Sequence, residues 1–361
     1  MDDRERFVAL MHYQDYDRMP IVHWDVWSET HERWVDEGLP EDADIWDFLD
    51  AVPRWNFVGG GILEPYPPFD EVVYEETEAY RIYLGPDGVI QKKWKDRTGI
   101  PQFIDFALKK ASDWPAFKER FLPNPGRITD ELDAEIAEAE HSSAPIAITL
   151  ASMMGWIRNW MGVENMAYLM HDEPDVYADM VDTLAELTCW SIDQVLPRMK
   201  TKPVLGVGWE DICFRSGPLI NPKFFERYVA PGYEKMGQKL GTHGIDLMAI
   251  DCDGLIEPLL RPWLDAGVNV HYPVEVGVWE ADPIALRKKF GRELRMVGGF
   301  NKLALELGPE AIDAEIQRRL PLVQDGGYII MPDHHITPGV PLKNYQYYTG
   351  RLHELSQEGL L

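Results

Sequence analysis

Short apolar runs recur along the chain, and most are followed by a stretch whose apolar residues are spaced three to four positions apart. The first kind of run predicts a buried strand, and the second predicts a helix packed on it. Eight such strands are predicted, over residues 20–24, 55–58, 145–150, 203–209, 245–251, 268–272, 294–297 and 328–332. Strands that alternate with helices favour a parallel sheet, and eight of them favour a (β/α)8 TIM barrel of the α/β class.

Two of the predicted helices have clear ends. Asn221-Pro222 begins a helix over residues 223–240, because the missing amide donor of proline has no helical partner in the first turn. Gly38-Leu39-Pro40 ends an earlier helix, which Ser28 or Thr30 can cap. Other helices are predicted over residues 4–12, 44–50, 256–266, 283–290 and 309–320, with two more between residues 153 and 199.

Between the second and third strands the pattern changes from helical spacing to alternation. Residues 72–76, 80–84 and 89–94 alternate, and a Gly-Pro-Asp-Gly turn at 85–88 joins the last two, which is typical of a β-hairpin. With the proline-rich, acidic stretch that follows, this pattern predicts an insertion over residues 61–144 that covers the barrel mouth. The whole chain, 1–361, is then a single domain.

Composition restricts the function classes. The formal net charge is −26 and no Lys/Arg cluster forms a basic face, which argues against nucleic acid as a partner. No apolar run approaches the ~20 residues that a membrane span needs. The opening MDDRERF has no secretory pattern, and the three cysteines have no CxxC spacing, so we expect a reduced, cytoplasmic setting.

Polar residues gather where the predicted strands end. Because the carboxyl ends of all strands in a parallel barrel meet at one face, we expect these side chains to converge there. They are His23, Glu210, Asp211, Asp251, Asp253, Glu275, Asn301, Lys302, Asp333, His334 and His335. Acids dominate, and buried like charges resist ionising together, so the group needs a cation, a proton or members that face outward.

A metal site is predicted within this group. Asp251, Asp253 and His334 offer oxygen and nitrogen ligands that zinc accepts, and Glu210 is the predicted fourth ligand or base. Asp253 also suits the N-cap of the following helix, and this alternative stays open. Adjacent histidines point to different sides, so only one of His334 and His335 needs to lie in the site.

Substrate contacts are predicted from the same strand ends. Trp24, Trp27 and Trp209 suit an aromatic substrate, although tryptophan also serves plain packing. The other predicted substrate contacts are His23, Arg158, Asn301 and His335, and the predicted catalytic residues are His334, Asp251, Glu210 and Lys302.

Several motifs of the second half occur in a recognisable order. Asp-Gly at 253–254 precedes a helix, and AGVNVHYPVE, VGGFNK and GGYIIMPDHHITPGVP follow, with Asn344 beyond. This order resembles the uroporphyrinogen decarboxylase superfamily over about residues 209–348, and the first half resembles it only through Asp17-Arg18-x-Pro20. The resemblance implies a (β/α)8 barrel and one of two activities: decarboxylation of a tetrapyrrole without a cofactor, or zinc-dependent methyl transfer involving a corrinoid protein.

The motifs separate these two activities in part. Decarboxylases carry an Arg-Gln-Ala-Gly-Arg segment after strand one that holds substrate carboxylates, whereas this chain has HWDVW at 23–27. The zinc-binding methyltransferase members of the superfamily that this chain resembles carry His-x-Cys-Gly after strand five and Gly-Cys-Gly after strand eight. Here these positions are Asp251-Cys252-Asp253-Gly254 and Asp333-His334-His335. Both thiolate ligands are replaced, so a metal site here is harder and richer in oxygen.

The resemblance therefore implies a methyltransferase, or demethylase, that moves a methyl group from a small methoxylated aromatic or methylated amine to a separate corrinoid protein. The chain has no Asp-x-His-x-x-Gly corrinoid module of its own. One alternative is a cofactor-free decarboxylase or lyase in which Arg158, Arg215 or Lys302 binds the substrate carboxylate and an Asp or His protonates the carbanion. Another is a non-catalytic barrel that binds a corrinoid or tetrapyrrole. Assembly as a homodimer also stays open.

Overall fold

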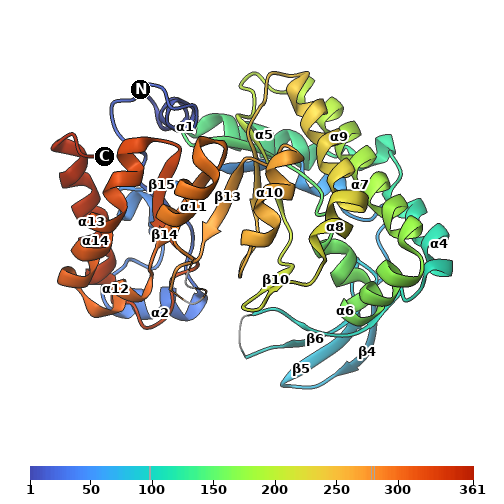
Figure 1. Ribbon diagram of the computed structural model, residues 1–361. Coiled ribbons are helices and arrows are strands. Elements are labelled where there is room, and N and C mark those ends of the chain that lie inside the picture. Colours follow the sequence, from blue (N-terminus) through green and yellow to red (C-terminus); the bar gives the residue numbers. More distant parts are fainter. Residues whose placement is uncertain (97–98, 278, 280) are drawn as a thin grey trace.

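Seven parallel strands form one curled sheet in the computed structural model, which describes residues 1–96, 99–277, 279 and 281–361 (Figure 1). Their order is β15-β14-β13-β12-β9-β8-β3. Their bounds are β3 Asn56–Val58, β8 Ile146–Thr149, β9 Leu205–Trp209, β12 Met248–Asp251, β13 Val270–Val274, β14 Arg295–Phe300 and β15 Tyr328–Pro332. Side chains of β13 and β15 are buried along their whole length, as expected for strands covered on both faces.

The first predicted strand completes the ring. β1 (Val22–His23) pairs with β2 (Val52–Pro53), which continues into β3. On the other side, Val26 forms a parallel bridge with Ile336, just after β15. Each predicted strand overlaps an observed one, and the predicted (β/α)8 barrel is confirmed.

Helices surround the sheet (Figure 1). They are α1 Asp3–Met11, α2 Ser28–Asp36, α3 Ile45–Phe48, α5 Asp130–His141, α6 Gly155–Asp172, α7 Pro174–Val195, α8 Pro222–Phe224, α9 Ala230–Gly241, α10 Glu257–Asp265, α11 Pro283–Phe290, α12 Leu303–Leu307, α13 Pro309–Asp325 and α14 Leu342–Gln357. The helix predicted over 223–240 contains a π-helical turn, Phe225–Val229, between α8 and α9. No helix of the described chain is both long and apolar enough to cross a membrane.

The segment between β3 and β8 carries an antiparallel sheet of four strands, seen at the lower edge of Figure 1. Its strands are β4 Val72–Glu76, β5 Tyr80–Leu84, β6 Val89–Trp94 and β7 Gln102–Phe106. The first three match the alternating pattern of the sequence, and β7 was not predicted. The predicted insertion, 61–144, also contains the short helix α4 (Trp114–Lys118) and α5, which packs on β3.

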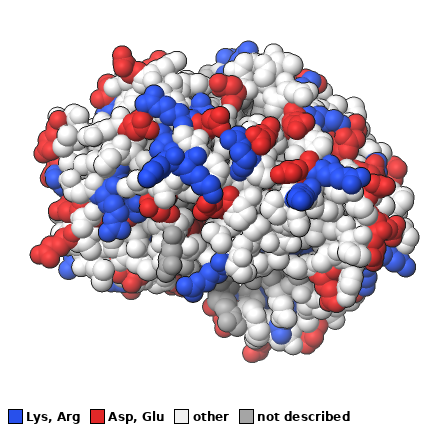
Figure 2. All heavy atoms as spheres, in the orientation of Figure 1, with Lys and Arg blue, Asp and Glu red and all other residues white. Residues whose placement is uncertain are grey.

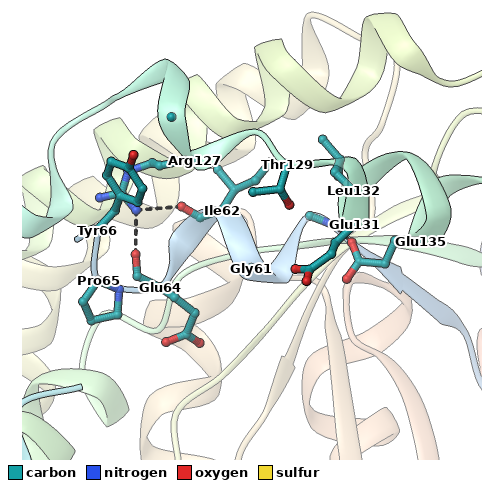
Figure 3. Close-up of a pocket in the computed structure, with 12 residues that line it drawn as sticks. Gly61, Ile62, Glu64, Pro65, Tyr66, Arg127, Thr129, Glu131, Leu132 and Glu135 are labelled. Carbon is teal, nitrogen blue, oxygen red and sulfur yellow. Dashed lines mark hydrogen bonds between the residues drawn. The ribbon is translucent and has the colours of Figure 1, made fainter. Parts of the chain in front are cut away.

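A buried arginine ties this segment together (Figure 3). The guanidinium of Arg127 donates hydrogen bonds to the carbonyl oxygens of Ile62 at 2.9 Å, Glu64 at 2.5 Å and Leu122 at 3.1 Å, and to that of Arg120. Burial lowers the pKa of Arg127 to about 10, so the group stays charged at neutral pH. One cation thus satisfies several carbonyls that no regular element pairs.

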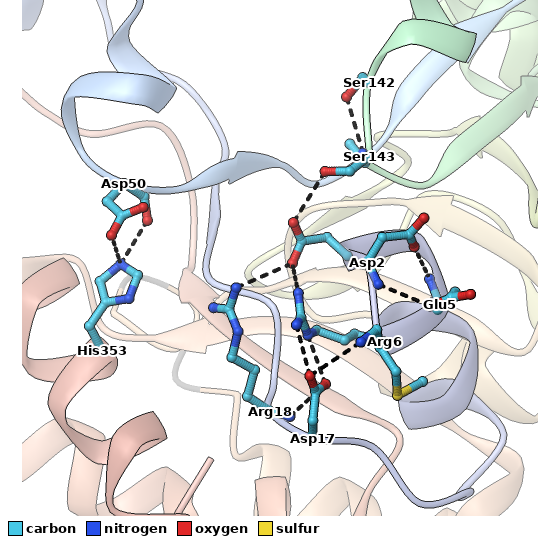
Figure 4. A network of polar contacts seen from close by, with 12 residues as sticks. Asp2, Glu5, Arg6, Asp17, Arg18, Asp50, Ser142, Ser143 and His353 are labelled. Atoms are coloured by element: carbon cyan, nitrogen blue, oxygen red, sulfur yellow. Dashed lines mark hydrogen bonds and ion pairs between the residues drawn. The ribbon is translucent and has the colours of Figure 1, made fainter.

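Polar contacts join the N-terminal helix to the chain just before β8, and in one of them Ser143 Oγ donates to Asp3 Oδ2 at 3.2 Å (Figure 4). Asp2 caps α1 in a capping box with Glu5. Arg4 donates to the carbonyls of Ser142 and Ala144, at 2.8 and 3.2 Å, immediately before β8. Over the face shown in Figure 2, basic side chains lie among acidic ones.

Candidate active site

Three potential ligands converge beyond the carboxyl ends of three strands. Asp253 follows β12, Glu275 follows β13 and His334 follows β15. One ligand atom from each lies within 4.8 Å of the other two. His334 Nε2 is 3.4 Å from Asp253 Oδ2. The structure therefore brings together two of the four predicted metal ligands, Asp253 and His334, and adds Glu275.

Asp253 faces this cluster and does not cap a helix. The helix that follows begins at Glu257, four residues later, with Ile256 in the N-cap position. Asp253 Oδ1 is buried and has no hydrogen-bond partner among the described residues. The N-cap alternative for Asp253 is therefore wrong, and its carboxylate keeps an oxygen free for a ligand.

Glycine fixes the turn that presents Asp253. Gly254 has φ +89°, and a Cβ there would lie 2.6 Å from the carbonyl oxygen of Cys213. Its amide donates to Glu275 Oε2 at 3.2 Å. The turn after β12 thus places Asp253 and orients Glu275 at once.

The acids of this rim suppress one another's ionisation. Burial, aided by the charges of Asp253 and Asp333, raises the pKa of Glu275 to about 8. Burial also raises the pKa of Asp251 well above its usual value, and the charges of Asp211 and Asp253 add to this. A bound cation would reverse these shifts, because it favours the ionised carboxylates. Asp251 lies near the cluster but outside the three mutually close ligands.

His334 is held in one orientation by its own backbone. The amide of His335 donates to His334 Nδ1 at 2.8 Å, so in a neutral ring the proton lies on Nε2, the atom near Asp253. This arrangement makes Nε2 a hydrogen-bond donor. Ligation of a metal through Nε2 needs the proton on Nδ1, and the contact with the His335 amide must then be given up.

Glu210 does not belong to the site, contrary to the sequence prediction. Its Oε2 accepts from Ser152 Oγ at 2.8 Å and from the amides of Met154 and Gly155 at 2.8 and 2.7 Å. Its Oε1 accepts from the amide of Met153 at 2.7 Å and from the Tyr233 hydroxyl. The carboxylate thus serves the N-terminus of α6 and has no oxygen left for a metal or a substrate proton.

Polar residues that follow β14 and β15 mostly make hydrogen bonds to the backbone of the rim. Asp333 accepts from the amides of Val276, Gly277 and Lys302 at 2.7 to 3.0 Å, which fixes the strand ends relative to each other. Asn301 Oδ1 accepts from the amide of Leu303, the first residue of α12, at 3.0 Å. Lys302 is buried, and its charge partly opposes the rise in the pKa of Glu275.

Aromatic rings line the opposite side of the cluster. The Trp24 ring lies 5.1 Å from the His334 ring and 4.7 Å from the His335 ring, between ring centres. Trp27 lies 5.2 Å from His335. His23 is fully buried, and its Nδ1 lies 2.6 Å from the Tyr345 hydroxyl. Trp24, Trp27, His335 and His23, all predicted substrate contacts, therefore belong to one aromatic region beside the cluster.

Arg158 and Trp209 lie elsewhere. The guanidinium of Arg158 donates to the carbonyl of Asp211 and to Asn159 Oδ1, and it lies 6.0 Å from the Trp209 ring. Trp209 lines a small cavity of about 150 Å³ between the barrel and the insertion. Both residues help to hold the rim near Asp211.

Sequence reasoning missed two residues of the site. Glu275 stood among the strand ends, but nothing in the sequence showed that it lies closer to His334 than Glu210 does. Arg54 precedes the predicted strand two and carries no motif, yet its guanidinium lies 4.6 Å from the centre of the Trp24 ring.

The donor set suits a transition metal. Two carboxylates and an imidazole within 4.8 Å of one another match the oxygen and nitrogen ligands of catalytic zinc, which keeps an open position. The free Oδ1 of Asp253 supports this fit.

Comparison with known proteins gives a family and a fold. The sequence model of uroporphyrinogen decarboxylase (URO-D) matches residues 126–355. A methyltransferase from Methanosarcina mazei superposes with a TM-score of 0.63 at 13% identity, over 98% of this chain and 99% of that one. A B12-independent methionine synthase from Shewanella sp. W3-18-1 gives a TM-score of 0.41 at 10% identity, over 80% and 74%. The search of curated proteins gives no match.

Proposed function

The chain belongs to the uroporphyrinogen decarboxylase family, and within it we propose that it is a methyltransferase. It would take a methyl group from a small methoxylated aromatic or methylated amine and pass it to a corrinoid carried by a separate protein. The observation that carries this proposal is the cluster of Asp253, Glu275 and His334. Asp253 and His334 occupy the two positions at which the zinc-binding methyltransferase members of the superfamily carry cysteine ligands.

Asp253, Glu275 and His334 would hold the metal. When bound, zinc acts as a Lewis acid and neutralises charge on the heteroatom that loses its methyl group. An alkoxide, phenoxide or amine leaves poorly without such help, so the reaction needs an acid of some kind at this point.

The chain's own residues supply further help to the leaving group. In the absence of a cation Glu275 has a pKa of about 8, is largely protonated at pH 7 and could itself give a proton to the heteroatom; a bound metal would ionise it and take over this role. Lys302 lies near enough to stabilise the carboxylate that remains. Trp24 and Trp27 form a wall against which the substrate can pack, which excludes water from the reacting atoms.

A decarboxylase or lyase is the second candidate, and one contact favours it. The His335 amide holds neutral His334 in the tautomer whose Nε2 carries the proton, so Nε2 can donate a hydrogen bond to a substrate carboxylate or to the charge that develops as it leaves. This function needs no metal, and it uses the same residues.

One variant separates the two candidates. Bound zinc and methyl-corrinoid formation are to be measured on wild type and His334→Ala, with His171→Ala, an exposed histidine of α6, as the control. The methyltransferase predicts that His334→Ala loses both zinc and methyl transfer, whereas His171→Ala keeps both.

A decarboxylase would give a different result. A wild-type protein that cannot be loaded with zinc and releases carbon dioxide from a carboxylated substrate contradicts methyl transfer. In that case His334→Ala should lose turnover without any change in metal content.

A further inference from the structure

The chain bends inside the barrel between β2 and β3. β2 pairs with β1 and β3 pairs with β8, so Arg54 and Trp55 form the link between the two pairings. The Trp55 side chain is buried, and Arg54 is half-buried. Both residues line a cavity of about 660 Å³ that Trp24 also borders.

The Arg54 guanidinium rests among aromatic rings without an acidic partner. Its central carbon lies 4.6 Å from the centre of the Trp24 ring and 5.5 Å from those of Trp55 and Tyr272. It forms no ion pair with any described residue, in a chain of net charge −26, and its Nε is buried without a hydrogen-bond partner among them. A guanidinium has five donors, so it has hydrogen bonds to offer an acceptor.

Several nitrogen atoms around Arg54 also have no partner among the described residues. They are Arg54 Nε, Trp55 Nε1, His23 Nε2 and His335 Nδ1, all buried. When the Tyr345 hydroxyl donates to His23 Nδ1, the proton of His23 lies on Nε2, which makes that atom a donor too. Arg54 Nε, Trp55 Nε1 and His23 Nε2 are then buried donors without acceptors, and His335 Nδ1 joins them in the tautomer that carries its proton on Nδ1. Such donors are costly, because each loses its hydrogen bonds to water.

The histidines lie within the electric field of Arg54. Burial lowers the pKa of His23 to about 3 and that of His335 to about 4, and the charge of Arg54 contributes to both shifts. The buried His23 ring is therefore neutral at pH 7, and Arg54 is the cation that these rings surround.

Acids near Arg54 do not neutralise it. Asp251 feels the charge of Arg54 but forms no ion pair with it, and burial raises the pKa of Asp251 well above its usual value. The cavity also carries exposed carboxylates, which stand in water where charges are strongly screened. They are Asp25, Asp44, Asp47, Glu135 and Glu138.

We propose that Arg54, together with His23, His335 and the Trp55 indole, binds the carboxylate of the substrate. These four residues form the Arg54 group. The planar fork of a guanidinium matches a carboxylate with two parallel hydrogen bonds, and a carboxylate accepts from several donors at once. This inference rests on the proposed function and selects a substrate class within it: an aromatic acid that carries a methoxy group.

The position of Trp24 supports an aromatic acid. Its ring lies between Arg54, at 4.6 Å, and His334, at 5.1 Å. A substrate that reaches from the Arg54 group to the metal ligands must therefore run along this ring. 4-Methoxybenzoate has its carboxylate and its methoxy group at opposite ends of one flat ring, which packs well against an indole.

Binding tests the inference without metal or corrinoid protein. The probes are 4-methoxybenzoate and its uncharged counterpart 4-methoxybenzamide, titrated by calorimetry against wild type, Arg54→Met and Arg54→Lys. We expect wild type to bind the acid at least tenfold more tightly than the amide. Arg54→Met should weaken binding of the acid by about 10- to 100-fold and bind the amide almost unchanged.

Arg54→Lys keeps the charge but loses the fork, so binding of the acid should fall between the other two proteins. It also serves if Arg54→Met does not fold. Arg227→Met removes an exposed arginine that rests on Tyr228 and should bind the acid as wild type does.

Three results would overturn the proposal: wild type binds neither probe, wild type binds the amide as tightly as the acid, or Arg54→Met binds the acid with wild-type affinity. None of them bears on metal content or methyl transfer, which are measured separately with His334→Ala. Conversely, a protein without methyl transfer activity can still show the acid preference of the Arg54 group.

Discussion

Replacement of Glu210 by glutamine should destabilise the fold and leave the metal site intact. The carboxylate accepts five hydrogen bonds in the barrel interior, three of them from the amides of Met153, Met154 and Gly155. Glutamine has one acceptor oxygen and one donor group. In one orientation its amino group meets the Met153 amide, and in the other it meets those of Met154 and Gly155.

The magnitude follows from these contacts. At least one buried backbone amide loses its acceptor, at a cost of about 1–3 kcal/mol. The remaining bonds lose the strengthening that a charged acceptor provides, which roughly doubles a hydrogen bond. We therefore expect Glu210→Gln to lower the free energy of unfolding by about 2–4 kcal/mol.

Urea unfolding followed by far-ultraviolet circular dichroism measures this loss as a lower midpoint at an unchanged slope. Glu164→Gln, an exposed change on the same helix, is the control and should stay within about 0.5 kcal/mol of wild type. Folded Glu210→Gln should take up zinc as wild type does. A variant of wild-type stability that has lost zinc would refute the reasoning and make Glu210 a ligand.

Other predictions follow from packing, titration and exposure. Gly155→Ala places a Cβ 2.5 Å from the carbonyl oxygen of Glu210, so its urea midpoint should fall by the equivalent of about 1–3 kcal/mol, whereas Gly241→Ala, with open space around it, should not show this loss. His23 and His271 have a pKa of about 3 in the fold, so the unfolded chain takes up their protons first, and stability should fall as pH drops from about 6.5 toward 3, by about 1.4 kcal/mol per pH unit for each. Urea midpoints at pH 7, 6 and 5 that do not fall would contradict this. Limited proteolysis should cut within residues 72–106 before the barrel, and a first cut in the barrel would contradict a protruding sheet.

The fold could be predicted because buried parallel strands leave a plain mark in the sequence. Runs such as Tyr328–Pro332 are apolar throughout, since both of their faces are covered. Strand ends were less certain. The strand predicted to stop at Val297 runs on to Phe300, because Gly298 and Gly299 continue it with φ values of +111° and +73°. Side-chain propensity gives no signal for such a path.

The site was predicted in part, for a related reason. Strand order brings Asp253 and His334 to one rim, so their positions after predicted strands were enough to predict that they lie close together. The choice between Glu210 and Glu275 depends on where the amides of α6 point, and Arg54 depends on a bend between two short strands. Both are matters of three-dimensional packing that no local pattern records.

The bonding of Glu210 has a further consequence for selectivity. The free amides at the start of a long helix attract anions, and α6 begins at the barrel mouth with such a set. Glu210 fills that position from within the chain, as a built-in ligand that never leaves. Free phosphate or a wrongly oriented acid therefore meets no vacant helix end at the start of α6.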